Sequence, residues 1–370
     1  MSTIWAKHPF KALYAAYIVT ETIAILPWLF LRYMPRAARP SPSWSIKICV
    51  ITALLRQLLR YHGKTQSTSM STVLSDHKKH RDRFALAQPA DVDLYSGVLT
   101  PGATQPAAVG GLWHPAPLFP GSPNIEDEKV VLHLPGGAFV MAFGTDENTQ
   151  NISRAMTKHL KATRTFVAQY RVSVDAGTRF PAALQDGVTF YHYILSLGVR
   201  PENVILSGDS AAGNLVIGML RYLESSSKLP LPGGAMVWSP WVQVTPQAAA
   251  DLAGYPNERF DMLPGSLLQW GADAYFPGTQ PSAEQLAYIS PLHRPFKTSV
   301  PLFIHACAAE ALFHVDQEFA REMAKIESNR VKFHVTEMGS HDLIIGYTGF
   351  GMENEIGSAI EDADKLFRQK

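Results

Sequence analysis

From residue 91 onward, short apolar runs alternate with longer stretches in which apolar residues recur every three or four positions. The short runs predict buried strands and the longer period predicts helices, so the alternation indicates βαβ units. We therefore expect an α/β fold with a mostly parallel eight-stranded sheet and helices on both faces. The predicted strands span residues 92–99, 110–114, 130–134, 165–170, 204–207, 235–238, 302–306 and 331–335, and the predicted helices span 149–160, 181–197, 211–223, 315–326 and 354–367.

Composition narrows the class of protein further. The chain has 370 residues, 46% of them hydrophobic, and 33 basic residues balance 32 acidic ones. This favours one large globular domain with additions and gives no basic surplus for nucleic acid. Cys49 and Cys307 stand far apart without a neighbouring His or Cys at ligand spacing, so we expect buried free thiols and no metal site.

The N-terminal segment is unusually apolar. Residues 12–31 form a run about one bilayer long, with basic residues before and after it. Glu21 and Pro27 oppose a spanning helix, because a buried carboxylate and a kink are both costly there. Residues 44–60 place their apolar side chains on one helical face. Two interpretations stay open for residues 1–85: membrane association through residues 12–31, of the endoplasmic-reticulum type, or a helical cap on the α/β domain of a cytoplasmic protein.

The sharpest local motif is an apolar strand that enters a turn of small residues and leaves into a helix, written VILSGDSAAGN at residues 204–214. A serine on such a turn is raised clear of the sheet and lies at the positive N-terminal end of a helix. Ser210 is therefore the candidate nucleophile. The alternative is a polar turn in which Asp209 or Ser210 only caps the helix.

Two further motifs lie at the ends of predicted strands. LPGGAF at residues 134–139 follows one strand, and its glycines leave backbone N–H groups free to face a cavity, as a developing oxyanion requires. GSHD at residues 339–342 follows the last strand, and there His341 has the order and turn context of a general base.

Together these motifs resemble the hormone-sensitive-lipase-like α/β-hydrolases, which typically show HGGGF, a YRLAPE-like segment and GDSAGGN. The similarity covers about residues 130–346 and includes YRVSVDAGTRFPAALQD, WSPW and ISPL in the family's order. Pro135, Ala138 and Ala212 depart from the family pattern at positions where it has His, Gly and Gly. A left-handed backbone at Ala138 would cost about 1 kcal/mol or more.

The resemblance implies an oxyanion hole at the glycine-rich turn and the elbow, assigned to Gly136, Gly137, Ala138 and Ala211. It also implies a triad acid after the penultimate strand, where the family has Asp and this chain has Glu310. Asp316 is the alternative acid. Asp342 is a poor candidate for the Nδ1 partner because it is adjacent to His341 in sequence, and Asp186 is expected to be a structural or surface acid.

The expected organisation is an N-terminal helical region at residues 1–85 and a catalytic domain at 86–370, with a cap insertion near 245–288 that is rich in apolar residues. The resemblance implies a serine hydrolase that cleaves a carboxylic ester, for example an acetate, of a small hydrophobic molecule, without a cofactor. The form with an apolar N-terminus resembles fungal members of natural-product pathways. Acyl transfer, lactone or amide hydrolysis and condensation remain alternatives, as does a non-catalytic binding protein. The oligomeric state is left open.

Overall fold

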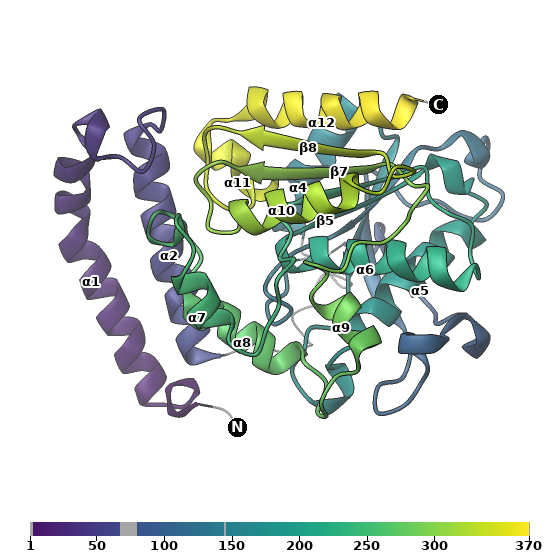
Figure 1. Cartoon of the computed structure of the whole chain (residues 1–370), viewed down its shortest axis with the longest axis horizontal. Coiled ribbons are helices and arrows are strands. Elements are labelled where there is room, and N and C mark those ends of the chain that lie inside the picture. The colour runs from purple at the N-terminus through teal and green to yellow at the C-terminus, as the bar shows by residue number, and fades with distance from the viewer. Residues whose placement is uncertain (1–2, 67–79, 144–145, 370) are drawn as a thin grey trace.

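The computed structural model describes residues 3–66, 80–143 and 146–369. Within these residues the chain forms one eight-stranded sheet in the order β1-β2-β4-β3-β5-β6-β7-β8 (Figure 1). β1 and β2 run antiparallel to their neighbours, and the strands from β4 to β8 are parallel. The strands are β1 Phe84–Ala87, β2 Val109–His114, β3 Val130–Leu134, β4 Arg164–Gln169, β5 Val204–Asp209, β6 Gly234–Trp238, β7 Leu302–Cys307 and β8 Val331–Thr336.

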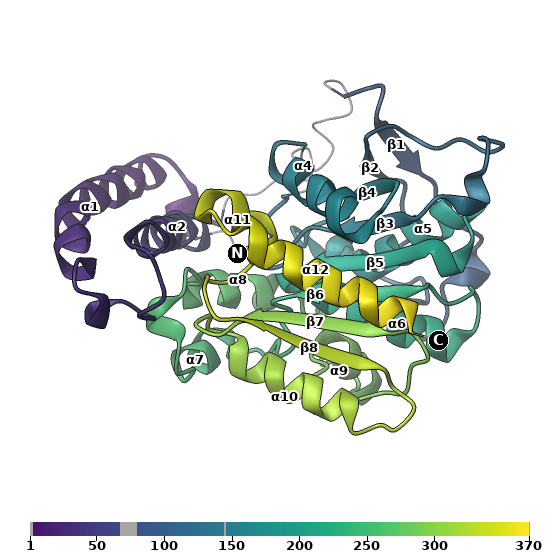
Figure 2. The same cartoon turned by 90° about the horizontal axis from the view of Figure 1, so that it is seen from above.

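The sheet separates two hydrophobic clusters because its central strands alternate their side chains between its faces. In β5, Leu206 packs into the cluster beneath α5 and α6, and Ile205 packs into the opposite cluster beneath α4 and α12. Figure 1 shows α12 above the strands and α5 and α6 below them, and Figure 2 shows the sheet from the side of α12. The α/β-hydrolase type of fold is thereby confirmed. The helices are α1 Phe10–Tyr33, α2 Ile46–Thr65, α4 Asp146–Ala155, α5 Ala182–Ser196, α6 Ser210–Ser226, α7 Ala248–Ala253, α8 Gly265–Tyr275, α9 Ala283–Ile289, α10 Phe313–Ala324, α11 Leu343–Phe350 and α12 Glu353–Arg368.

One predicted strand was wrong. Residues 92–99 form two short 3-10 turns, Val92–Leu94 and Gly97–Leu99, instead of an extended segment. The Tyr222 hydroxyl binds the Leu94 carbonyl and accepts from the Ser96 N–H, so these backbone groups are satisfied without a neighbouring strand. The eighth strand is β1, which the sequence analysis missed because it is only four residues long and lies at the sheet edge.

The N-terminal helices form a hairpin beside the sheet domain (Figure 1). Helix α1 is long and apolar enough to cross a membrane by length and composition. Helix α2 packs on α8, and this contact needs Gly63, since a Cβ there would lie 2.7 Å from the Leu267 nitrogen. Arg56 of α2 donates to the carbonyl oxygens of Glu258 and Asp261, both at 2.7 Å. The insertion is thus tied to the N-terminal helices.

The boundary expected between residues 85 and 86 falls inside β1. The insertion expected near residues 245–288 contains α7, α8 and most of α9. Cys49 and Cys307 are buried free thiols, as the sequence predicted.

Candidate active site

Ser210 lies where β5 ends and α6 begins, with a left-handed backbone (φ 52°). The turn is tight enough that a Cβ at Gly208 would lie 2.5 Å from the Ala212 oxygen, and one at Gly213 would lie 2.9 Å from Pro240. Small residues at these positions therefore let the helix begin immediately after the strand. Ala212 is fully buried, and the unusual φ falls on Ser210 instead. A strained serine at a strand-to-helix turn is the arrangement of a nucleophile elbow.

The glycine-rich turn after β3 contacts this elbow directly. The Gly136 N–H donates to Asp209 Oδ2 at 2.8 Å, and a Cβ at Gly136 would lie 2.4 Å from the same oxygen. The other oxygen, Asp209 Oδ1, lies 3.1 Å from His133 Nε2 in a fully buried pair. Because its N–H is already bound, Gly136 does not serve as an oxyanion donor, which corrects the assignment made from sequence. Its place in the turn is structural.

The rest of that turn is held with its backbone in unusual conformations. Gly137, Ala138 and Phe139 all have positive φ, at 130°, 52° and 61°. The Phe139 ring stacks on Tyr275 with centroids 3.7 Å apart, which fixes the turn against α8. Tyr170 donates its hydroxyl to the Pro135 carbonyl at 2.7 Å. Packing from outside the turn therefore maintains the left-handed backbone of Ala138, which is costly for an alanine.

His341 brings its imidazole to the elbow. Its Nε2 lies 2.8 Å from Ser210 Oγ, a hydrogen bond between residues 131 positions apart, and both side chains are buried. Its Nδ1 lies 3.7 Å from Glu310 Oε2, which is an ion-pair contact longer than a hydrogen bond. The three residues selected from the sequence therefore meet in one place.

Glu310 is the acid that faces Nδ1. It is fully buried, and the hydroxyl of Ser239 donates to its Oε2 at 2.7 Å. Burial raises the pKa of Glu310, and the interactions with His341 oppose that rise. Asp316 is also buried, but neither of its carboxylate oxygens has a hydrogen-bond partner among the described residues. Burial, reinforced by Glu310, raises the pKa of Asp316 well above its ordinary value.

Asp186 is a structural acid. It is fully buried in α5 and accepts from the Arg171 backbone N–H at 2.8 Å and from the Arg171 guanidinium at 2.7 Å. Burial raises the pKa of Asp186, and Arg171 opposes that rise. This pair lies in the chain segment between the two motifs and joins the loop after β4 to α5.

Asp342 occupies an unexpected place. It does not approach Nδ1, as the sequence analysis anticipated, but its Oδ2 lies 3.2 Å from Nε2 of His341. Burial favours the neutral imidazole, yet Asp342 and Glu310 outweigh it and hold the pKa of His341 well above its ordinary value. Burial raises the pKa of Asp342 to about 7 against the opposing attraction of His341.

Sequence reasoning missed Asp261, which comes from the insertion. Its Oδ1 accepts from the backbone N–H groups of His341 at 3.0 Å and Met262 at 2.8 Å, and its Oδ2 accepts from that of Ala311 at 2.8 Å. No sequence signal identifies this residue, since it lies 80 positions before the histidine and belongs to no recognised motif.

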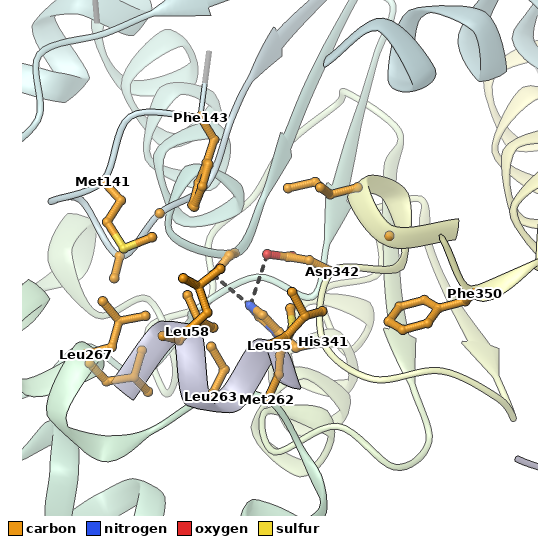
Figure 3. Close-up of a pocket in the computed structure, with 17 residues that line it drawn as sticks. Leu55, Leu58, Met141, Phe143, Met262, Leu263, Leu267, His341, Asp342 and Phe350 are labelled. Carbon is orange, nitrogen blue, oxygen red and sulfur yellow. Dashed lines mark hydrogen bonds and ion pairs between the residues drawn. The ribbon is translucent and has the colours of Figure 1, made fainter. Parts of the chain in front are cut away.

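A cavity of about 320 Å³ opens in front of Ser210. Figure 3 shows side chains of α2, the insertion and α11 around His341 and Asp342. The polar side chains among the described lining residues are Ser210, His341 and Asp342, and the remainder are apolar or glycine. The other lining residues are Leu55, Leu58, Leu59, Gly137, Ala138, Met141, Phe143, Met262, Leu263, Leu267, Leu268, Ile345, Gly346 and Phe350.

Comparison with known proteins places the chain in a family. The pattern of the alpha/beta hydrolase fold matches residues 131–345, more than half of the chain, so the protein belongs to the α/β-hydrolase fold family. The resemblance to the hormone-sensitive-lipase-like group is confirmed. A solved esterase from the bacterial hormone-sensitive lipase family superposes with a TM-score of 0.58 at 20% identity, covering 88% of this chain and 99% of that one. At that identity the likeness shows the fold alone.

Relatives found by sequence cover the same region. An acetyl-hydrolase of Streptomyces hygroscopicus is 30% identical over 206 residues, which are 56% of this chain and 64% of that protein. An esterase of Acinetobacter venetianus is 26% identical over 209 residues, again 56% of this chain and 64% of the relative. The chain thus matches just under two thirds of the length of these relatives.

Proposed function

We propose that this protein is a serine esterase in which Ser210 is the nucleophile and His341 the general base. The observation that carries the proposal is the 2.8 Å contact between His341 Nε2 and Ser210 Oγ, at the mouth of an apolar cavity. The hydroxyl starts a helix whose N-terminal dipole favours the developing negative charge. Names of the relatives, an acetyl-hydrolase and an esterase, support the same reaction.

In the proposed acylation step, Ser210 Oγ attacks the ester carbonyl as its proton passes to Nε2. Glu310 orients the imidazole through Nδ1 and stabilises the imidazolium. The backbone N–H groups of Gly137, Ala138 and Ala211 bind the oxyanion. His341 then gives its proton to the departing alcohol, and water activated by the same nitrogen releases the acid from the acyl-enzyme.

The cavity supports a small, mostly apolar substrate. Its volume of about 320 Å³ is at the lower end of ligand pockets, and leucine, methionine and phenylalanine side chains dominate the lining. An acetate of a compact hydrophobic alcohol fits this space. Placement in a secondary-metabolite pathway is a prediction from the sequence resemblance.

The test of the proposal is a panel of p-nitrophenyl esters of increasing acyl length, together with labelling by a fluorophosphonate probe. We expect hydrolysis with a preference for short acyl groups, and labelling that Ser210→Ala abolishes. Ser196→Ala, at the exposed C-terminal end of α5, is the matched control. Equal turnover by wild type and Ser210→Ala would refute the proposal. Product analysis in the presence of an acceptor alcohol separates hydrolysis from acyl transfer.

We also propose that α1 associates with a membrane surface. Its large apolar side chains are exposed, among them Leu13 at 60%, Ile23 at 65% and Leu31 at 66%. Glu21, the residue that opposes a spanning helix, lies 3.3 Å from Arg60 of α2. The charge of Glu21 is therefore paired within the hairpin and does not face the membrane. Arg32 lies in the last turn of the helix, and Arg36 follows the helix. Such an amphipathic arrangement suits an interfacial helix.

Flotation with vesicles containing anionic lipid tests this second proposal. The full chain should float. A triple variant should not float but should stay folded, because its three substitutions, Leu13→Glu, Ile23→Glu and Leu31→Glu, are at exposed side chains. Val92→Glu changes an equally exposed residue (64%) on the sheet domain and should leave flotation intact. Flotation of the triple variant would contradict the proposal.

A further inference from the structure

Asp342 stands at the start of α11, where an aspartate ordinarily accepts hydrogen bonds from the first turn of the helix. Here it makes no such cap, and its backbone is left-handed (φ 58°). Its own N–H donates to the Ser239 hydroxyl at 3.3 Å. The carboxylate is therefore turned away from the helix and lines the cavity beside His341 (Figure 3).

This carboxylate lies close to the place where the departing alcohol must be during ester cleavage. Nε2 of His341 has two oxygen neighbours, Ser210 Oγ at 2.8 Å and Asp342 Oδ2 at 3.2 Å. During ester cleavage this nitrogen first faces the nucleophile and then faces the oxygen of the departing alcohol. The second neighbour of Nε2 therefore adjoins the space that the alcohol oxygen must use.

The carboxylate also has unused hydrogen-bonding capacity. Asp342 Oδ1 is buried and has no hydrogen-bond partner among the residues that the structure describes. The side chain is 10% exposed, and its neighbours in the cavity wall, apart from Ser210 and His341, are apolar or glycine. A buried acceptor without a partner is costly, so a ligand that supplies a donor there is favoured over one that does not.

Two simpler roles do not account for this residue. It does not replace the triad acid, because Glu310 faces Nδ1 and Asp342 faces Nε2. It is not a helix cap, because it makes no capping hydrogen bond. What remains is an acceptor beside the reacting bond in an otherwise apolar cavity.

We propose that Asp342 determines specificity for the alcohol part of the substrate by accepting a hydrogen bond from a hydroxyl group carried next to the scissile ester oxygen. The preferred substrates are then monoesters of vicinal diols, apolar elsewhere. When such a substrate binds, its hydroxyl donates to the carboxylate of Asp342, and Nε2 of His341 keeps its contact of 2.8 Å with Ser210 Oγ. This inference rests on the proposed esterase function.

Three acetates of nearly equal size test the inference on the full chain. Catechol monoacetate carries the neighbouring hydroxyl, ortho-cresyl acetate replaces it by methyl, and guaiacyl acetate keeps the oxygen but lacks the proton. We expect the wild-type kcat/KM for catechol monoacetate to exceed that for the other two by about tenfold or more, as a hydrogen bond to a charged group allows.

The variants separate recognition from reactivity. Asp342→Asn keeps the size and tolerates the left-handed backbone, whereas Asp342→Gly removes the side chain and favours that backbone. The ratio of the hydroxyl ester to the methyl ester should fall in the first variant and fall furthest in the second. A ratio within each variant is insensitive to a general loss of activity or folded protein. Ile345→Val changes the same cavity wall without touching the carboxylate and should keep the wild-type ratio.

Each outcome is decisive. Equal kcat/KM for the three esters in the wild type, or an unchanged ratio in both Asp342 variants, overturns the inference and leaves the esterase function standing. If the wild type hydrolyses none of the three and Ser210 is not labelled by the fluorophosphonate, the proposed function fails and the inference fails with it.

Discussion

Asp261 Oδ1 accepts a hydrogen bond from the backbone N–H of His341 at 3.0 Å, so a residue of the insertion fixes the turn that carries the proposed base. The second oxygen of the same carboxylate binds the N–H of Ala311, next to Glu310. One buried side chain therefore sets the positions of two loops that must meet for Nδ1 to face its acid. The proposed catalytic geometry therefore depends on a residue with no proposed contact with substrate.

Replacing this carboxylate should harm both stability and activity. Asp261→Ala leaves the N–H groups of Met262, Ala311 and His341 without their acceptor, so we expect a loss of about 2–4 kcal/mol in the free energy of unfolding. We also expect kcat to fall by more than KM rises in the folded fraction. Urea denaturation and steady-state kinetics measure the two effects. Asp93→Ala, an exposed aspartate, is the control and should change neither.

Glu310 and Asp316 should respond differently to amide substitution. Glu310→Gln removes the charge that orients His341, and we expect kcat to fall by about 100-fold or more. The carboxylate of Asp316 has no hydrogen-bond partner among the described residues, and its raised pKa favours the neutral acid. Asp316→Asn should therefore keep kcat within a few-fold. The reverse order would transfer the role of triad acid to Asp316.

The pH dependence of kcat/KM should reveal the coupling of His341 to Asp342. His341 accepts the serine proton only without a proton on Nε2, and the neighbouring carboxylates raise its pKa. Activity should therefore rise as pH increases through the titration of the pair. Asp342→Asn removes one carboxylate and lowers the pKa of His341, so the acid limb should move by about one pH unit or more to lower pH.

The control for that profile is Asp362→Asn. The carboxylate of Asp362 lies 3.1 Å from the imidazole of His334 on β8, so this variant also loses a carboxylate beside a histidine, but one away from the site. Its acid limb should coincide with that of the wild type. Rates of ester hydrolysis measured from about pH 5 to pH 9 resolve the limb. A limb that stays in place in Asp342→Asn would show that the two side chains do not share a titration.

Replacing Ala138 by glycine should stabilise the folded protein. Its φ of 52° is left-handed, which costs alanine about 1–2 kcal/mol and costs glycine little. After the greater flexibility of glycine in the unfolded chain is counted, Ala138→Gly should raise stability by up to about 1 kcal/mol. Thermal unfolding measures the change. Ala250→Gly, on the exposed side of α7, should have the opposite sign, and a fall in both variants would contradict the argument.

The local motifs were readable because each depends on neighbours in sequence. The run that became β5 and α6 combines an apolar strand, small turn residues and a helical period, so Ser210 could be placed before any coordinates. His341 followed from the order of motifs in the family. The strand predicted at residues 92–99 failed because its backbone is satisfied by Tyr222, far along the chain. The apolar residues of this segment correctly predicted that Leu94 and Leu99 are buried, but Val92 is exposed and the predicted extended conformation was wrong.

By itself, the sequence determined the family, the strands from β2 to β8, the helices α4, α5, α6, α10 and α12, and the three residues that meet at the site. The tertiary structure alone decided that Gly136 is bound by Asp209 and that Asp261 holds the turn of His341. It also decided that Asp342 faces Nε2 and that Leu55 and Leu58 of α2 line the cavity. Strand and helix periods are encoded within a few residues, whereas these contacts join distant segments and depend on backbone direction, which chain packing sets.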